Sequence, residues 1–221
     1  MIIGAGLRLP STHEIKFEKE IHMNMKFGIL AFNDLEELDA IGPWEVLSWA
    51  AKQEQSDMEV YTIGSSGKEI RCAKGLNIVT DYTIDDHPPL DVILVPGGQG
   101  TRPIFKNGGP EIDWIKKVAP DCTWVTSVCT GALLLHRAGL LDGKRVTTHW
   151  GSVDLLRDAG GVEVMDNVRY VRDGNLVTSA GVSAGIDMAL WLIGEIYGSD
   201  FARFVQKGIE YFPAPPYTAE T

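Results

Sequence analysis

The sequence predicts an α/β protein in which a mostly parallel central sheet carries helices on both of its faces. Short apolar segments alternate with longer amphipathic segments along the chain, which is typical of strands that alternate with helices. The segment Val92–Val95 is apolar at every position, as expected for a strand that is buried on both faces. The chain has 24 glycines, mostly at expected turns, which favours a fold with many tight strand–helix connections.

Short apolar segments are predicted to be strands at residues 26–32, 59–63, 92–95, 123–128, 145–148, 169–171 and 176–179. Segments with helical spacing are predicted to be helices at residues 41–53, 110–118, 130–138, 151–158, 184–197 and 201–209. Pro110 suits a first helical turn, and Gly139 and Gly198 suit helix C-termini. Ser183 and Ser199 are expected to be helix N-caps.

The chain is predicted to hold one domain. Its 221 residues, 44% of them hydrophobic, suit a single globular unit. Residues 1–24 are polar and aperiodic, and we expect an N-terminal extension there, followed by a single domain over residues 25–221. The alternative is an arm that packs on the body or on a partner. Residues 65–82 and 169–179 are expected to be hairpin-like excursions from the sheet.

Composition excludes several classes of function. The formal net charge of −10 makes nucleic acid and anionic membrane surfaces poor partners. No apolar run approaches the roughly 20 residues that span a bilayer. The three cysteines have no CxxC or Cys/His ligand spacing, so neither a disulfide framework nor a metal site is expected. Without the basic and apolar regions of a signal peptide, the expected location is a reducing cytoplasm.

The segment Ser127-Val128-Cys129-Thr130-Gly131 carries the strongest chemical signal. It joins an expected strand to a leucine-rich helix, so backbone N–H groups and a positive helix end lie beside the Cys129 sulfur. That setting favours the thiolate, which is the nucleophilic form. The turn resembles the nucleophile elbow of serine hydrolases with sulfur in place of oxygen. Cys129 is therefore the predicted nucleophile, whereas Cys72 and Cys122 have no comparable setting and are expected to be inert.

Two further segments are expected at the same edge of the sheet. Asp39 lies just after the first strand, where it is either an N-cap or a carboxylic acid beside the sulfur. Burial near a negative sulfur raises the pKa of a carboxyl group, so that the group can deliver a proton. Gly97 and Gly98 follow the strand Val92–Val95 and permit close approach of backbone N–H groups.

Two other residues have open roles. His149 lies 20 residues after Cys129 and is either its catalytic partner or a structural histidine on the pocket rim. Thr130 is either a group that holds substrate or water, or a residue of the first helical turn.

These motifs together resemble the ThiJ/PfpI superfamily, and most of all its isocyanide hydratases. The motifs are LDAIGP around Asp39, PGG at 96–98, SVCTG at 127–131, TTHW at 147–150, VRDGNLVTSAGVSAGID at 171–187 and EYFPAPPY at 210–217. The resemblance implies a flavodoxin-like three-layer sandwich that forms homodimers, with Cys129 as nucleophile and Asp39 as acid/base. Protease-like members carry a histidine immediately after the cysteine; Thr130 stands there in this chain, which counts against peptidase activity.

The activity that the resemblance implies is hydration of an isocyanide to an N-substituted formamide, without metal or organic cofactor. In this mechanism Cys129 forms a thioimidate, Thr130 positions substrate or water, and backbone N–H groups near Gly97 and Gly98 line the cavity, with His149 a further substrate-binding candidate. One alternative is a glyoxalase-type hydratase of reactive aldehydes or another small-molecule hydrolase. Another is a redox-responsive protein in which Cys129 is oxidised. A ligand-sensing regulator domain is less expected, because only four residues follow Tyr217 and leave no room for a helix-turn-helix.

Overall fold

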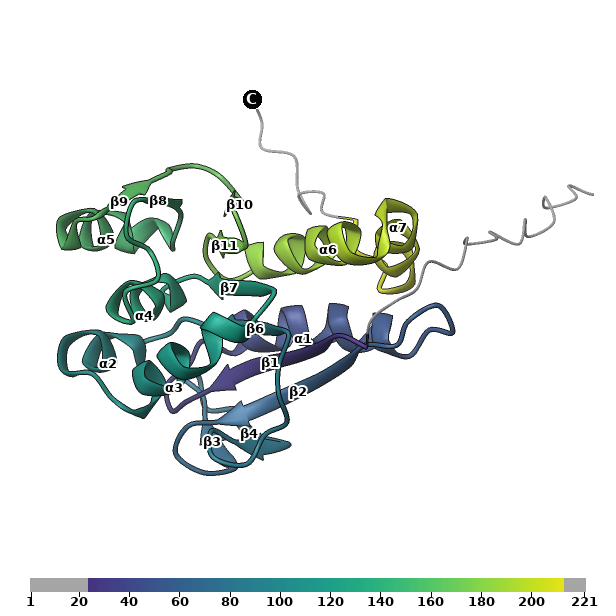
Figure 1. The fold of residues 1–221 in the computed structure, drawn as a ribbon, viewed down its shortest axis with the longest axis horizontal. Helices are drawn as coiled ribbons and strands as arrows, with labels where there is room; N and C mark the ends of the chain where they lie inside the picture. Colours follow the sequence, from purple (N-terminus) through teal and green to yellow (C-terminus); the bar gives the residue numbers. More distant parts are fainter. Residues whose placement is uncertain (1–23, 213–221) are drawn as a thin grey trace, which may run out of the picture.

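The computed structural model describes residues 24–212. The predicted N-terminal extension therefore lies outside the described residues, apart from Asn24, and so does the segment 213–221. Within residues 24–212 the predicted α/β architecture is confirmed: a central sheet lies between two layers of helices (Figure 1).

The central sheet has seven strands in the order β10-β11-β7-β6-β1-β2-β5. All neighbours are parallel except β10 and β11, which pair antiparallel at one edge. The strands are β1 (Lys26–Ala31), β2 (Glu59–Gly64), β5 (Tyr82–Thr83), β6 (Val92–Val95), β7 (Trp124–Val128), β10 (Tyr170–Asp173) and β11 (Leu176–Ser179). The order places β6 and β7 side by side, with Val95 opposite Ser127, so the loops that follow these two strands meet at one edge.

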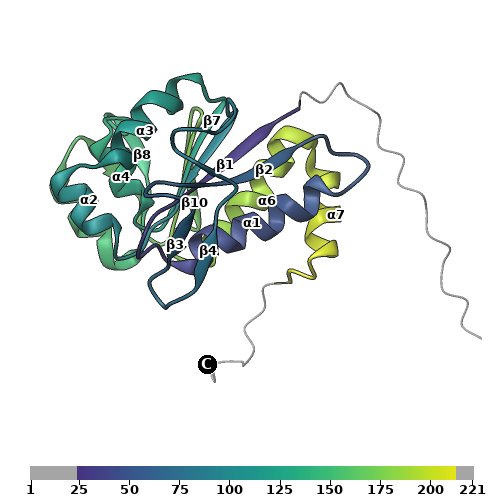
Figure 2. The same cartoon turned by 90° about the horizontal axis from the view of Figure 1, so that it is seen from below.

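Helices cover both faces of this sheet. On one face lie α1 (Glu37–Ala51), α6 (Ala184–Tyr197) and α7 (Ser199–Gly208), which contact one another. On the other face lie α2 (Thr101–Asn107), α3 (Pro110–Val118) and α4 (Gly131–Arg137) (Figure 2). Smaller elements complete the fold: the hairpin β3 (Glu69–Arg71) with β4 (Asn77–Val79), the pair β8 (Lys144–Val146) with β9 (Val162–Val164), α5 (Val153–Ala159), and the 3-10 turns η1 (Ala119–Asp121) and η2 (Trp150–Ser152).

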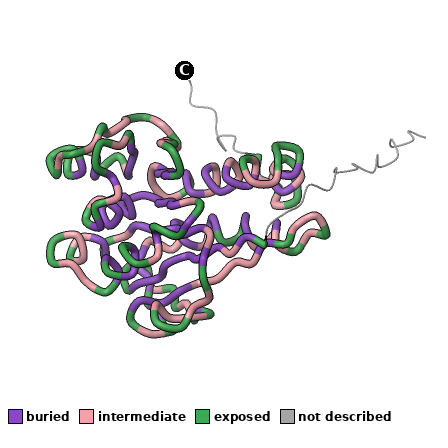
Figure 3. Tube along the Cα trace, viewed as in Figure 1, coloured by how far each residue is buried: buried purple, intermediate pink, exposed green. Residues whose placement is uncertain are grey.

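The hydrophobic core follows from the strand sequences. Strand β6 is buried at all four positions, and β11 is as well, which is the burial expected of central parallel strands. The helix α4 adds three consecutive leucines, Leu133 to Leu135, that have no exposed surface. Buried positions accordingly gather along the sheet and on the inward faces of the helices (Figure 3). This rigid core positions the loops at the carboxyl edge of the sheet.

Two predicted strands belong elsewhere than expected. The predicted strand at 145–148 becomes β8, which pairs with β9 in a separate two-stranded sheet. The segment 169–179 is no excursion, because β11 pairs in parallel with β7 and its partner β10 forms the edge of the central sheet. Pairing over such sequence distances depends on tertiary packing, which local patterns do not reveal.

Helix boundaries also differ from the predictions. Helix α1 begins at Glu37, so Asp39 lies within its first turn and is not its N-cap. Helix α7 begins at Ser199, after Gly198 as N-cap, and Ser183 occupies the N-cap position of α6 without a side-chain capping bond. Helix α2 was not predicted, because its arginine–proline start follows a glycine-rich loop.

Candidate active site

Cys129 occupies the predicted sharp turn between β7 and α4. Its φ is 58°, in the left-handed region that residues other than glycine seldom adopt. The Cys129 N–H donates to the carbonyl groups of Ser179 and Ala180, at 3.1 and 3.0 Å, and the Thr148 hydroxyl donates to the Cys129 carbonyl at 2.8 Å. Such a backbone conformation costs about 1–3 kcal/mol of folding free energy and persists only where its surroundings hold it in place. These three hydrogen bonds hold the turn.

Gly131 lets the turn pack directly onto the neighbouring strand. A Cβ atom at Gly131 would lie 2.0 Å from the Val95 carbonyl oxygen, so no larger residue fits. Because Val95 ends β6, this contact brings the loop that carries Gly97 and Gly98 beside Cys129.

Asp39 reaches the same place from the first turn of α1. Its side chain has no exposed surface, and its Oδ2 accepts a hydrogen bond of 2.9 Å from the Gly97 N–H. Oδ1 is buried and has no hydrogen-bond partner of normal geometry among the described residues. The Cys129 thiol is near enough to affect the pKa of Asp39, although the contact falls short of a formed hydrogen bond. A buried oxygen without a partner favours protonation.

The pKa values of both groups are raised. Burial raises the pKa of Asp39 to about 7, against the opposing hydrogen bond from Gly97. Burial, followed by the negative charge of Asp39, raises the pKa of Cys129 to about 12, while the N–H and hydroxyl of Thr130 lower it in part. The raised pKa runs against the expectation of a resting thiolate, because the burial of Cys129, which is only 6% exposed, outweighs the donors of Thr130. A sulfur that acts as a nucleophile would first have to lose its proton, and Asp39 is the adjacent acceptor.

The two N–H groups of the glycine loop are bound to protein atoms. The Gly97 N–H holds Asp39, and the Gly98 N–H donates to Thr130 Oγ1 at 2.9 Å. A Cβ atom at Gly97 would lie 2.5 Å from the Thr130 nitrogen, and Gly98 has a φ of 124°. In this structure the loop thus aligns the acid and the elbow. Its predicted contact with substrate stays a prediction.

Thr130 joins the elbow to this loop. It is buried, and besides accepting from Gly98 N–H its hydroxyl lies 3.2 Å from the Gly98 carbonyl oxygen and 2.9 Å from Thr101 Oγ1. Thr101, which is fully buried at the start of α2, was not predicted as a site residue. The available signal was a threonine three residues after the glycine pair, at the first residue of a helix.

Among the described residues, His149 makes no hydrogen bond to the Cys129 thiol. Its Nδ1 accepts from the Gly151 N–H at 3.1 Å, which assigns the ring proton to Nε2. The ring packs against Gly181, where a Cβ atom would lie 2.3 Å from the ring. The strand before His149, β8, lies outside the central sheet, contrary to the prediction, and a role of His149 as partner of the thiol stays a prediction. The rim position is the one that the structure favours.

A polar cavity of about 520 Å³ adjoins the elbow. His149, Thr148 and Val182 are among its lining residues, and Thr148 bonds the Cys129 carbonyl. Val182 was not predicted as a site residue: it has a φ of 51°, rare for a β-branched residue, and its backbone lies near enough to Asp39 to lower the pKa of that carboxyl slightly. We find no sequence signal for this conformation.

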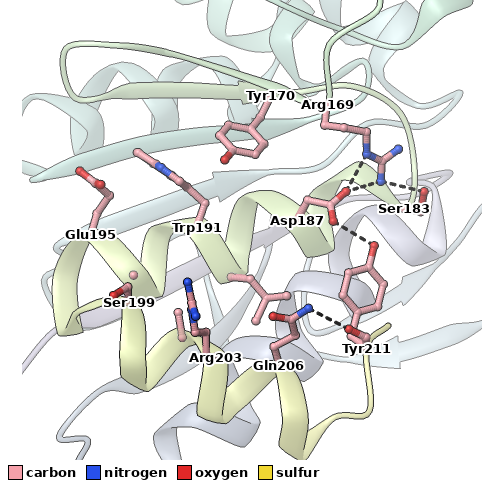
Figure 4. A pocket seen from close by; sticks show the side chains of 13 residues that line it. Arg169, Tyr170, Ser183, Asp187, Trp191, Glu195, Ser199, Arg203, Gln206 and Tyr211 are labelled. Atoms are coloured by element: carbon pink, nitrogen blue, oxygen red, sulfur yellow. Dashed lines mark hydrogen bonds and ion pairs between the residues drawn. The ribbon is translucent and has the colours of Figure 1, made fainter. Parts of the chain in front are cut away.

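A larger cavity, of about 980 Å³, lies between α6, α7 and β10, and the predicted catalytic residues are not among its lining residues. The Arg169 guanidinium holds Asp187 and Ser183 there, and the Tyr211 hydroxyl donates to Asp187 at 3.0 Å (Figure 4). These bonds tie β10 and the end of the described chain to the start of α6.

Within residues 24–212, no group of three or more His, Cys, Asp or Glu side chains is arranged to hold a metal ion. Over the same residues no helix is both long and apolar enough to cross a membrane. Cys72 and Cys122 are buried, and burial raises the pKa of each, to about 11 and about 12. Their predicted inertness is consistent with that setting.

Comparison with known proteins gives a consistent picture. Residues 25–195 match the model of the DJ-1/PfpI family. The chain is 43% identical to an isonitrile hydratase of Pseudomonas putida over 195 residues, which cover 88% of this chain and 82% of that protein. A solved ThiJ/PfpI family protein from Pseudomonas syringae aligns with a TM-score of 0.83 at 28% identity, covering 97% of this chain and 86% of that one. The transcriptional regulator GbdR of Pseudomonas aeruginosa is 30% identical over 68% of this chain, but the match spans only 41% of the regulator.

Proposed function

The chain belongs to the DJ-1/PfpI family, and from that premise we propose that it hydrates isocyanides, R–N≡C, to N-substituted formamides with Cys129 as nucleophile. The observation that carries the proposal is the buried pair of Asp39 and Cys129, in which each group alters the pKa of the other. The similarity to the Pseudomonas putida isonitrile hydratase supports the substrate class, since isonitrile and isocyanide are the same functional group.

In the first step the Cys129 proton passes to the Asp39 carboxylate, and the sulfur attacks the terminal carbon of the isocyanide. A C–S bond forms while one C–N π bond moves its electrons onto the nitrogen, and the carbon keeps the lone pair that it already carried. Asp39 then protonates the carbon, which yields the thioimidate R–N=CH–S–Cys129. A pKa of about 7 suits Asp39 for both transfers near neutral pH.

In the second step Asp39, again a carboxylate, takes a proton from water while the water oxygen bonds to the thioimidate carbon. The proton passes to the substrate nitrogen. The C–S bond then breaks, the sulfur leaves with the bonding electrons, and the hydroxyl proton returns to the sulfur through Asp39. The formamide R–NH–CHO departs, and both protein groups are restored.

The other predicted site residues take supporting roles in this proposal. Thr130 helps to position substrate or water beside the sulfur, and Gly97 and Gly98 line the reacting space while they align Asp39. His149 lines the neighbouring polar cavity and is a substrate-binding candidate at its rim. No organic cofactor enters either step.

The setting of the thiol discriminates among the alternatives. A redox-responsive cysteine needs an exposed thiol of low pKa, whereas Cys129 is 6% exposed and burial raises its pKa to about 12. A glyoxalase-type hydratase would use the same two residues, so only substrate profiling separates it from an isocyanide hydratase.

The test is formamide production from cyclohexyl isocyanide by wild type, Cys129→Ala and Asp39→Asn, with methylglyoxal as the rival substrate. We expect formamide from wild type and loss of turnover in both variants. Cys122→Ala is the matched control, because it removes a buried thiol far from Asp39 in sequence and should keep full activity. Full activity of Cys129→Ala would refute the mechanism, and turnover of methylglyoxal alone would favour the glyoxalase reading.

A cytoplasmic homodimer is part of the same proposal. Leu38 and Trp44 on α1, and Leu76 and Val79 on or beside the β3–β4 hairpin, are exposed large apolar side chains. A second copy that covers them would lie close to Asp39, which follows Leu38 directly. Sedimentation of wild type and Val79→Glu tests this: a dimer that dissociates in the variant supports it, and a wild-type monomer contradicts it.

A further inference from the structure

The segment 180–183 connects strand β11 to helix α6 and supports the backbone of the nucleophile. The Ala180 carbonyl accepts from the Cys129 N–H at 3.0 Å, and Val182 has a φ of 51°. A β-branched residue in the left-handed region is strained, so a segment that contains one keeps its conformation only where its neighbours hold it. The groups that hold this segment therefore also hold the hydrogen-bond acceptor of the elbow.

Arg169, which directly precedes β10, contacts both ends of the segment. Its backbone carbonyl accepts from the Ala180 N–H at 2.9 Å, and its guanidinium donates to Ser183 Oγ at 3.1 Å. Ser183 is available for this contact because, within the described chain, its side chain makes no capping bond at the start of α6. Since Ala180 is the first residue of the segment and Ser183 the last, one residue bridges the whole segment.

The guanidinium is fixed by a second contact on the first turn of α6. Its Nε donates to Asp187 Oδ2 at 2.6 Å, and the Tyr211 hydroxyl donates to the other carboxylate oxygen at 3.0 Å (Figure 4). Asp187 lies four residues after Ser183, which is about one helical turn. The planar guanidinium fork can therefore bind the serine and the aspartate together.

The effect of this ion pair should be local. The Arg169 side chain is about half exposed, and exposed ion pairs contribute little to global stability because water and salt screen them. The segment that Arg169 bridges, in contrast, supplies an acceptor for the Cys129 N–H. A displacement of about 1 Å at a reacting group can slow a reaction roughly 100-fold, so a small local shift matters more for turnover than for folding.

We propose that Arg169 is a positioning residue of the active site: by bridging Ala180 and Ser183 it keeps the Ala180 carbonyl in place for the Cys129 N–H and so holds the elbow in its left-handed conformation. This inference deepens the proposed function and rests on Cys129 being the nucleophile. It does not depend on which electrophile the sulfur attacks. The alternative is direct contact with substrate, because Arg169 also lines the polar cavity beside the elbow.

The first test is hydrogen exchange of the Cys129 backbone amide, followed by NMR, in wild type, Ser183→Ala and Ser183→Thr. Alanine removes one acceptor of the Arg169 guanidinium and leaves the ion pair with Asp187 in place. We expect exchange to become about tenfold faster in Ser183→Ala, because a hydrogen bond to a charged group is lost. Ser183→Thr keeps a hydroxyl and should stay within about twofold of wild type. Unchanged exchange in Ser183→Ala would overturn the proposal.

Arg172 supplies a matched control. It lies on β10 and pairs with Glu195 near the opposite end of α6, at 2.8 Å, and its side chain is about as exposed as that of Arg169. Arg172→Met thus removes an ion pair between the same edge of the sheet and the same helix. Exchange of the Cys129 amide should stay within about twofold of wild type in Arg172→Met and become about tenfold faster in Arg169→Met. Equal acceleration in both would indicate general loosening of α6 and would overturn the proposal.

Steady-state kinetics with cyclohexyl isocyanide give the second test. In Arg169→Met we expect kcat to fall about tenfold with KM within about twofold of wild type. Arg169→Met should add little further loss in a Ser183→Ala background, because both changes remove the same contact. A raised KM with unchanged kcat would assign Arg169 to substrate binding and refute the positioning role.

The two tests separate this inference from the proposed function. Hydrogen exchange involves no isocyanide. Faster exchange in Ser183→Ala, from a protein whose wild type forms no formamide, would therefore refute the hydratase proposal and leave the positioning role of Arg169 supported.

Discussion

Replacing Asp39 by asparagine should stabilise the folded protein, and the gain should grow with pH. Asparagine has nearly the same shape, and its side-chain oxygen can accept from the Gly97 N–H as Oδ2 does at 2.9 Å. The amide has no charge to bury. Wild type, in contrast, has to hold an ionised carboxylate without exposed surface once the pH passes the pKa of the group.

The magnitude follows from the shift in pKa. Burial raises the pKa of Asp39 from its ordinary value of 3.8 to about 7. Each pKa unit corresponds to about 1.4 kcal/mol, so ionised Asp39 costs the folded state about 4 kcal/mol. The folded pKa is the higher one, so this cost is absent below about pH 4, accumulates between pH 4 and 7, and is constant above pH 7.

The assay is urea unfolding of wild type and Asp39→Asn from pH 4 to 8 at one protein concentration. The difference in free energy of unfolding should rise from below about 1 kcal/mol at pH 4 to about 4 kcal/mol at pH 8. Asp158→Asn on α5 is the control, because it removes an exposed aspartate and should show no such trend. Parallel curves for wild type and Asp39→Asn would refute the assignment of a raised pKa to Asp39.

Other predictions follow from the same geometry. The reactive form of the Asp39–Cys129 pair holds one proton, on the thiol, so kcat/KM should rise with pH until Asp39 is ionised. It should level off above about pH 7 and fall tenfold per pH unit well below that value. A kcat/KM that does not change between pH 5 and 8 would contradict this. Gly131→Ala should destabilise the fold by several kcal/mol, because the new Cβ would lie 2.0 Å from the Val95 oxygen, and thermal unfolding measures the loss. Gly194→Ala, inside α6, should instead stabilise the fold by about 0.5–1 kcal/mol, because its Cβ would meet Ala202 at an ordinary 3.5 Å, and a lowered Tm would count against it.

Local patterns predicted the strands and helices whose signals lie within a few neighbouring residues. The apolar run Val92–Val95 became a strand buried at every position, and Pro110 opens α3. The periodic segment 184–197 became α6 at the predicted bounds. These elements were predictable because burial on one or both faces leaves a regular spacing of apolar residues in the sequence.

Long-range pairing was less predictable. Strands β8 and β9 form their own sheet, and β11 joins the central sheet beside β7. The local sequences of these strands do not indicate which strand each one pairs with. His149 shows the consequence, since it was expected at the end of a strand of the central sheet and instead follows β8. Pairing partners are chosen by packing and loop closure over the whole chain, which a single segment does not record.

The sequence by itself determined the α/β class, the elbow at Cys129 and the candidate acid Asp39, because a strand–turn–helix motif and an acidic residue after the first strand are local features. Only the tertiary structure decided the proton chemistry. Burial of both groups in one site makes the resting sulfur a thiol and the carboxyl a group that titrates near neutrality. It also decided that Thr101, from a helix without a clear sequence signal, meets Thr130 at 2.9 Å. A pKa depends on how much water and charge surround a group in three dimensions, and those surroundings come from segments far apart in the chain.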